Sequence, residues 1–264
     1  MTTTRPPNID VAAALGEAEE QYRARNSKSL AQHRTACKAM PGGNTRSAIH
    51  VDPFPLTMVR GEGARLWDLD GHEYVDFLSE FTAGICGHSH PIIRQAITAA
   101  LEGGLNFGAH NATEVRFAAA ICARFPSIDL VRFTNSGTEA NLMAVSAARA
   151  ITGRPKILVF EGGYHGGVFY FRGHGSPLNA PFEYLLGRYN NLAAVEALVR
   201  PYRTELAAIL IEPMQGTTGC ILAERSFLAG LRALADETGA LLIFDEVMTS
   251  RLAPGGLQEA HEIL

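Results

Sequence analysis

The second half of the chain alternates short apolar segments with longer amphipathic ones, and this alternation limits the possible folds. Helical spacing of apolar residues is found over 137–151, 191–200 and 225–238. The expected strands between these helices are LVRF at 130–133, KILVF at 156–160, AAILIEP at 207–213 and ALLIFDE at 240–246. Strands covered on both faces have nearly continuous apolar sequences, and strands that alternate with helices pair in parallel. The sequence therefore predicts an α/β fold with a mainly parallel sheet and helices on both faces.

The first part of the chain has a different pattern. Apolar and charged residues alternate at helical spacing over 9–39, up to Met40-Pro41-Gly42-Gly43. Strand signals follow over 56–77, where Asp70-Gly71 suits a tight hairpin. We therefore expect residues 1–80 to form an N-terminal helix and a small antiparallel strand unit. Residues 81–264 are expected to form the large domain, which begins with helices at 91–102 and 113–124.

Composition excludes several classes of function. The net charge is −4 over 264 residues, so no basic field favours nucleic acid or an anionic membrane. No apolar run is long enough to span a bilayer, and acidic residues stand where a signal peptide needs its apolar core. The cysteines are scattered and predict reduced thiols in a cytoplasmic protein, with neither a metal site nor a disulfide framework; they are Cys37, Cys86, Cys122 and Cys220.

Polar residues follow several of the expected strands. Ser136-Gly137-Thr138 lies where LVRF gives way to a helix, and such residues either cap the helix or hold an anion at its positive end. Asp245 ends LLIFD, where a carboxylate is either a turn residue or the partner of a ring nitrogen. Tyr164 either covers the sheet edge or stacks on a flat ligand. Because ligands bind beyond the carboxyl ends of parallel strands, we expect one shared site there.

Several motifs together resemble a known family. FTNSGTEAN, FEGGYHGG, ILIEPMQG and LIFDEVMTSR, in this order, are similar to segments of the class III aminotransferases, fold-type I enzymes that use pyridoxal 5′-phosphate. GEGARLWDLDGHEYVDFLSE and GHSHP resemble the N-terminal part of the same family, and the likeness covers nearly the whole chain from about Met40. It implies a fold-type I large domain with an N-terminal part of the small domain. A GxGxxG dinucleotide loop follows none of the expected strands.

The resemblance implies where the polar ends of the cofactor bind. Ser136, Gly137 and Thr138 would hold its phosphate, and Asp245 would pair with its pyridinium nitrogen. That pairing suits a cofactor whose ring must withdraw electrons.

The resemblance also implies how the cofactor ring is held. Tyr164 would stack on one face, and Val247, two residues after the carboxylate, would pack on the other. His165 and Glu212 would support these cofactor-binding residues without taking part in the reaction themselves. Since fold-type I sites are usually built at a subunit interface, a homodimer is expected.

The substrate is inferred from one arginine and from the subgroup of the family that the motifs resemble most. Arg46, in MPGGNTRSA, is either a solvated surface residue or a two-pronged clamp for a substrate carboxylate, and the resemblance favours the clamp. Thr217 stands where many ω-amino-acid members carry a Glu. YHGGVF and DEVMTSRL resemble the aromatic β-amino acid (β-phenylalanine type) aminotransferases, which transfer the amino group to a 2-oxo acid such as 2-oxoglutarate. The alternative is a glutamate-1-semialdehyde aminomutase.

One expected residue is missing from the chain. Amino transfer in this family needs a lysine that binds the cofactor and moves the proton. The lysines of this chain, Lys28, Lys38 and Lys156, match no such position. We therefore expect the N-terminal part of a longer enzyme, or a truncated product; the alternative is a non-catalytic remnant that still binds cofactor.

Overall fold

The computed structural model describes residues 10–46, 49–173 and 175–263. The chain divides into two compact units, Met1–Asn106 and Phe107–Leu264, called unit 1 and unit 2 below. The domain division expected after residue 80 stays a prediction. Each unit is described by itself.

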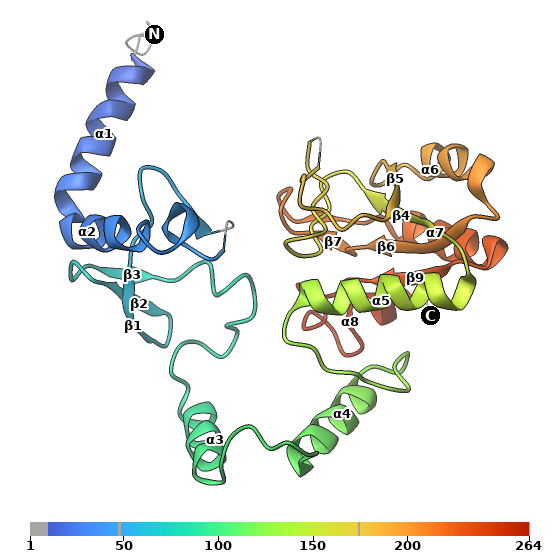
Figure 1. Ribbon diagram of the computed structural model, residues 1–264, viewed down its shortest axis with the longest axis horizontal. Helices are drawn as coiled ribbons and strands as arrows, with labels where there is room; N and C mark the ends of the chain where they lie inside the picture. The colour runs from blue at the N-terminus through green and yellow to red at the C-terminus, as the bar shows by residue number, and fades with distance from the viewer. Residues whose placement is uncertain (1–9, 47–48, 174, 264) are drawn as a thin grey trace, which may run out of the picture. The chain divides into compact units, whose positions relative to one another are not determined.

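Unit 1 combines helices with a small antiparallel sheet (Figure 1). The sheet has the order β1-β2-β3, and both strand pairs are antiparallel, as predicted. Gly71 in the turn between β2 and β3 has a φ of +97°, a conformation that favours glycine. The elements of unit 1 are α1 (Val11–Arg25), α2 (Ser27–Ala36), the 3₁₀ turn η1 (Pro41–Gly43), β1 (Met58–Glu62), β2 (Arg65–Asp68), β3 (Glu73–Val75) and α3 (Pro91–Glu102).

A buried carboxylate holds the β2–β3 hairpin in shape. Asp68 is 2% exposed and accepts hydrogen bonds from the Tyr74 hydroxyl (2.7 Å), His72 Nδ1 (2.9 Å) and the His72 backbone N–H (2.8 Å). Burial alone would raise the pKa of Asp68, but the hydrogen bonds from Tyr74 and His72 lower it to about 2. Asp70 in the same turn accepts from the backbone N–H groups of Lys28 and Ser29, which ties the hairpin to α2.

Unit 2 is built on a four-stranded parallel sheet. Its strand order is β5-β4-β6-β9, and all three neighbouring pairs are parallel, so the predicted α/β architecture is confirmed. The strands are β4 (Lys156–Phe160), β5 (Glu183–Gly187), β6 (Leu206–Ile211) and β9 (Leu241–Phe244). The helices are α4 (Ala112–Arg124), α5 (Gly137–Thr152), α6 (Leu192–Val199), α7 (Arg225–Thr238) and α8 (Gly256–Ala260), with a 3₁₀ turn at Arg200–Tyr202 and a two-stranded ribbon of β7 (Met214–Gln215) and β8 (Ile221–Leu222).

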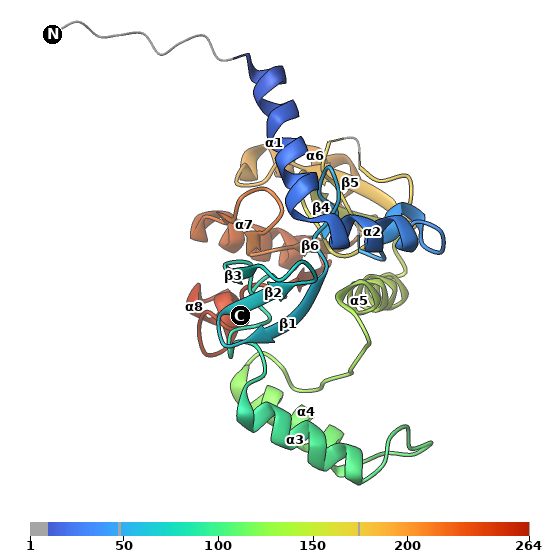
Figure 2. The same cartoon turned by 90° about the vertical axis from the view of Figure 1, so that its left-hand side faces the viewer.

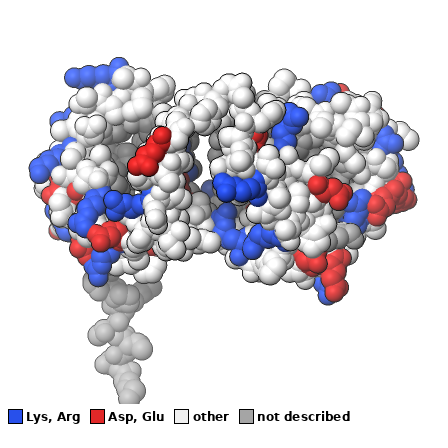
Figure 3. Space-filling view, turned by 90° about the horizontal axis from the view of Figure 1, so that it is seen from below, with Lys and Arg blue, Asp and Glu red and all other residues white. Residues whose placement is uncertain are grey.

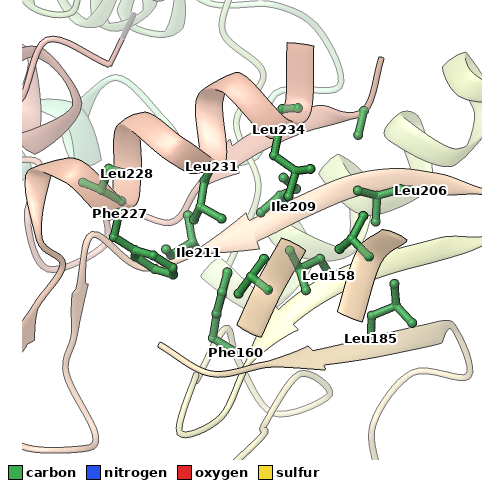
Figure 4. Packing of buried hydrophobic residues seen from close by; sticks show 14 of the residues in the cluster. Leu158, Phe160, Leu185, Leu206, Ile209, Ile211, Phe227, Leu228, Leu231 and Leu234 are labelled. Carbon is green, nitrogen blue, oxygen red and sulfur yellow. The ribbon is translucent and has the colours of Figure 1, made fainter. Parts of the chain in front are cut away.

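Helices cover both faces of this sheet, with α5 and α7 on opposite sides of the strands (Figure 2). On one face, Phe227 and Leu231 of α7 point toward Phe160 and Ile211 of the strands (Figure 4). On the other face, Val145 of α5 packs in a second apolar cluster with residues from β4 and β6. Every residue of β6 is buried, as a central parallel strand requires. The sheet is therefore a rigid base for the loops at its ends.

One strand prediction in unit 2 is wrong, and one strand of its sheet was not predicted. Residues 130–133 form no strand, because no neighbouring strand is hydrogen-bonded to them in the described chain. Leu130 is 91% exposed there, and Phe133 instead stacks on Phe117 of α4, with ring centroids 5.0 Å apart. The strand β5 was missed, since it lies in a stretch between helices that has little regular pattern.

The surface has no dominant sign of charge on the face that Figure 3 shows, where basic and acidic side chains are interspersed. Among the helices at residues 10–46, 49–173 and 175–263, none is both long enough and apolar enough to cross a membrane.

We predict that Asp68→Asn destabilises unit 1 at neutral pH by about 1–3 kcal/mol, because the half-buried donors of His72 and Tyr74 lose their buried, ionised acceptor. Since the pKa of Asp68 is lowered to about 2, its stabilisation is present above the ordinary value near 4 and is lost as pH falls toward 2. The difference between variant and unaltered protein should therefore shrink between about pH 4 and pH 2. Urea unfolding, followed by fluorescence of Trp67, the single tryptophan, measures it.

Asp52→Asn is the matched control, because the Asp52 side chain is 94% exposed. A difference between Asp68→Asn and the unaltered chain that stays constant from pH 7 to pH 2 would contradict this account.

Candidate functional site

The loops that follow β4, β6 and β9 meet at the carboxyl edge of the parallel sheet. The first hydrogen bond between them joins the Tyr164 backbone N–H, after β4, to Glu212 Oε2, after β6 (3.0 Å). A second joins His165 Nδ1 to Asp245 Oδ2, after β9 (2.9 Å). Residues far apart in the sequence are thereby brought together where parallel sheets bind ligands.

Asp245 is the centre of this edge. Its side chain is 6% exposed, and its Oδ2 accepts from both His165 Nδ1 (2.9 Å) and Asn141 Nδ2 (2.9 Å). Its Oδ1 accepts from the Val247 backbone N–H (3.2 Å). Asn141, in α5, also donates to the His165 carbonyl (3.2 Å). One carboxylate therefore joins the first part of α5, the loop after β4 and the end of β9.

The two buried carboxyl groups of the site have pKa values shifted in opposite directions. Burial would raise the pKa of Asp245, but the hydrogen bond and the charge of His165, aided by Val247 and Asn141, lower it below its ordinary value. Burial raises the pKa of Glu212, and this effect outweighs the charge of His165 and two backbone N–H groups. Asp245 is thus the carboxyl group that the surroundings hold ionised.

Glu212 connects two loops through its two oxygens. Its Oε2 accepts from the Tyr164 backbone N–H, and its Oε1 accepts from the Gly216 backbone N–H (3.3 Å). The Tyr189 hydroxyl donates to the Glu212 carbonyl (2.8 Å). Further along the same contact, Thr217 Oγ1 donates to the Gly162 carbonyl (3.0 Å). These contacts fix the backbone of Tyr164 relative to the end of β6.

The start of α5 has free helical N–H groups at the same edge. Ser136 is the N-cap and accepts from the Glu139 backbone N–H (3.2 Å), while Glu139 accepts from the Asn135 backbone N–H (2.8 Å). In a helix of 16 residues, the first-turn N–H groups of Gly137 and Thr138 have no intrahelical acceptor. They point out of the positive end of the helix, which favours an anion.

Two apolar side chains at this edge are open to solvent. Tyr164 is 39% exposed and makes an edge-on contact with Tyr170, with ring centroids 5.7 Å apart. Val247 is 57% exposed, and its Cγ2 lies 3.6 Å from the position that a Cβ on Gly137 would take. Both are therefore available to contact a ligand at the start of α5.

The structure brings eight of the nine predicted site residues to this edge of unit 2. They are Ser136, Gly137, Thr138, Tyr164, His165, Glu212, Asp245 and Val247. Asn141 was missed by the sequence interpretation. An Asn inside a helix is unfavourable, and its place in FTNSGTEAN was the signal that could have found it.

The ninth predicted site residue belongs to unit 1, and the lysine of unit 2 lies at the other end of its strand. Arg46, in unit 1, forms an ion pair with Glu80, and its guanidinium lies 5.8 Å from the centroid of the Phe81 ring. Lys156 is at the amino end of β4, away from the edge that carries the site, and it pairs with Glu183 (2.8 Å). Lys156 is the only lysine of unit 2, so no lysine of this unit lies at the site.

Comparisons with known proteins agree with this geometry. The β-phenylalanine transaminase of Variovorax paradoxus is 52% identical over 244 residues, which are 92% of this chain and 56% of that protein. The crystal structure of a β-phenylalanine aminotransferase from the same organism superposes with a TM-score of 0.92 at 51% identity, covering 95% of this chain and 58% of that one. The chain thus spans little more than half the length of the relatives it matches.

More distant structures share the fold. A transaminase with pyridoxal 5′-phosphate bound is 37% identical, with a TM-score of 0.82 over 89% of this chain and 58% of that one. A glutamate-1-semialdehyde aminomutase from Pseudomonas aeruginosa is 25% identical, with a TM-score of 0.83 over 96% of this chain and 58% of that one. The family profile of class III aminotransferases matches residues 46–257. This match covers most of the chain, which therefore belongs to the class III aminotransferase family.

Proposed function

We propose that this chain forms the cofactor-binding part of a pyridoxal 5′-phosphate-dependent aminotransferase. The enzyme would move the amino group of an aromatic β-amino acid to a 2-oxo acid such as 2-oxoglutarate. The observation that carries the proposal is the buried, ionised Asp245 beside the open N-terminus of α5. The 52% identity to a β-phenylalanine transaminase supports the choice of substrate.

The residues at the carboxyl edge fit the phosphate of this cofactor. The first-turn N–H groups of α5 are hydrogen-bond donors at the positive end of the helix dipole, and Thr138, in the same turn, adds a hydroxyl donor. The Glu139 carboxylate, which would repel a phosphate, is instead turned back to the backbone N–H of Asn135. The start of α5 therefore offers donors to the phosphate, and the Glu139 carboxylate is bonded to Asn135 instead of to those donors.

The same edge fits a flat ring with a protonated nitrogen. Asp245 offers an ionised carboxylate, while Tyr164 and Val247 offer exposed apolar surface. When bound, pyridoxal 5′-phosphate supplies an electron-withdrawing ring that stabilises the negative charge left after a proton leaves the amino-bearing carbon. His165 and Asn141 keep the Asp245 carboxylate oriented, and Glu212 keeps the Tyr164 backbone in place.

Substrate binding is proposed for Arg46. Its guanidinium can donate a two-pronged hydrogen bond to a carboxylate, and its ion pair with the Glu80 carboxylate supports this choice. We also propose that the enzyme is a cytoplasmic homodimer. Exposed apolar side chains on α3 and α4, such as Ile92 (70% exposed) and Phe117 (56% exposed), support an assembly that covers them.

An aminomutase of glutamate-1-semialdehyde is the second candidate, because the Pseudomonas enzyme has the same fold over 96% of this chain. The lower identity of 25%, against 52% for the transaminase, favours amino transfer. A cofactor-binding remnant without activity is a third candidate, since Lys156 lies at the wrong edge of the sheet.

The test continues this chain with the part of the Variovorax paradoxus enzyme that the match leaves out. We expect this protein to transfer amino groups from β-phenylalanine to 2-oxoglutarate, and to leave glutamate-1-semialdehyde almost unchanged. The 264-residue chain alone should show no turnover, because no lysine of unit 2 lies at the site. Preference for glutamate-1-semialdehyde, or a folded, cofactor-binding protein without amino transfer, would overturn the proposal.

We predict that Asp245→Asn in the continued chain lowers kcat for β-phenylalanine by on the order of 10²-fold or more. The amide would leave the ring nitrogen without an ionised partner. Asp236→Asn is the matched control, because Asp236 lies on α7 with its side chain 65% exposed and pairs with Arg232. Steady-state kinetics measures both variants. Equal activity of the two would remove Asp245 from the mechanism.

Arg46→Ala should raise KM for β-phenylalanine by roughly 10- to 100-fold, because a charge-assisted hydrogen bond to the carboxylate is lost. The effect on kcat should be smaller, since a carboxylate clamp binds substrate and transition state alike. Arg60→Ala is the control, as Arg60 is an exposed arginine that pairs with Glu62. An unchanged KM in Arg46→Ala, measured with kcat in the same assay, would show that Arg46 is not the clamp.

A further inference from the structure

A glycine in the loop after β4 lies unusually close to the start of α5. Gly166 has a φ of +112°, a conformation that favours glycine. A Cβ at this position would lie 2.1 Å from Thr138 Oγ1 and 2.6 Å from Thr138 Cα. Because the Cα belongs to the backbone, no rotation of the Thr138 side chain can make room. Any side chain at residue 166 must therefore push the loop away from the helix.

The close approach allows two hydrogen bonds between the loop and α5. The Gly167 backbone N–H donates to Thr138 Oγ1 (3.1 Å), and Asn141 Nδ2 donates to the His165 carbonyl (3.2 Å). The loop is thereby attached to the first two turns of the helix on both sides of Gly166.

The bond from Gly167 also determines what the Thr138 hydroxyl can do. A hydroxyl carries one hydrogen and two acceptor lone pairs. Since Oγ1 accepts from Gly167, its hydrogen remains to be donated elsewhere. Thr138 is in the first turn of α5, where the unpaired N–H groups favour an anion. A hydroxyl that already accepts a hydrogen bond is also a better donor, because hydrogen bonds in chains strengthen one another.

We propose that Gly166 is a positioning residue that holds the Thr138 hydroxyl ready to donate to the phosphate of the cofactor. This inference rests on the proposed function. Gly166 does not itself contact the phosphate; it acts by letting Gly167 reach Thr138. Its loss should therefore weaken binding of the phosphate and leave binding of the ring almost unchanged.

The experiment uses the 264-residue chain with pyridoxine 5′-phosphate and pyridoxine as probes. Neither carries an aldehyde, so neither reacts with lysine, and they differ only in the phosphate. Gly166→Ala is compared with Gly167→Ala, whose added Cβ would have no atom within 4 Å and which keeps the backbone N–H. Dissociation constants come from equilibrium titration, and urea unfolding shows how much of each variant is folded.

We expect Gly166→Ala to weaken pyridoxine 5′-phosphate binding by about tenfold or more, the range for a lost hydrogen bond to a charged group. Binding of pyridoxine should change by less than about twofold, as should binding of both probes to Gly167→Ala. Thr138→Ala should show the same selective loss. The double variant Gly166→Ala/Thr138→Ala should bind no more weakly than the weaker single variant, because both changes remove one interaction.

Several outcomes would overturn the inference. The first is that Gly166→Ala and Gly167→Ala bind pyridoxine 5′-phosphate equally well. The second is that Gly166→Ala weakens the binding of both probes to the same extent. The third is that the losses of affinity from Gly166→Ala and Thr138→Ala add in the double variant. If Gly166→Ala unfolds, Thr138→Ser and Thr138→Val test the same step, since serine keeps the hydroxyl and valine keeps the shape. Equal phosphate-probe affinity in those two variants also overturns it. Failure of the unaltered chain to bind either probe would instead overturn the proposed function, and the role of Gly166 with it.

Discussion

The candidate site depends on the burial of one negative charge. A carboxylate taken out of water is costly unless it is paired and hydrogen-bonded. Asp245 meets this requirement with His165 from the loop after β4, Asn141 from α5 and the backbone N–H of Val247. Each partner comes from a different segment, so the charge can be buried only when all three are in place. The need to pair the buried charge of Asp245 therefore also determines how these segments are arranged at the edge of the sheet.

The opposite pKa shifts of Asp245 and Glu212 follow from their partners. Both groups are buried and both feel the charge of His165, but only Asp245 receives a hydrogen bond from it. The Glu212 carboxyl group accepts hydrogen bonds only from backbone N–H groups, one on each oxygen. Its pKa is raised by burial and by the nearby Asp245. Environments that push two pKa values apart assign different roles to similar side chains. Here Asp245 provides charge, and Glu212 provides a connection between two loops.

The sequence predicted the fold where local pattern and tertiary packing agree. The helix at Gly137–Thr152 and the strand at Lys156–Phe160 were found because their apolar residues face the core that their spacing implies. The segment at 130–133 has the residues of a strand, but a strand exists only with a hydrogen-bonded neighbour, and no local pattern shows one. The meeting of Tyr164, Glu212 and Asp245 at one edge was predictable because parallel topology brings the ends of the strands together. Gly166 was not, because its role depends on a contact with Thr138, more than twenty residues away. Asn141 was missed although an Asn inside a helix was a signal for it.

Rigid and exposed parts of this edge contribute differently to binding. Asp245, His165 and Glu212 are buried, so their positions are determined before any ligand arrives. Tyr164 and Val247 are exposed, and a flat ring that covers them removes apolar surface from water. That gain is nearly the same for any ring of suitable size, since it depends on area alone. In the proposed function, the selection of one cofactor among flat molecules would therefore come from its two charged ends, with the ring nitrogen at Asp245 and the phosphate at the start of α5. The protein groups for these two ends are held by one continuous contact between α5 and the loop after β4. In it, Asn141 and His165 donate to the Asp245 carboxylate, and Gly167 donates to the Thr138 hydroxyl. Within that contact, the Gly167 bond supports the phosphate end and the Asn141 and His165 bonds support the ring-nitrogen end, so a change confined to the Gly167 bond would weaken recognition of the phosphate and leave the partner of the ring nitrogen in place.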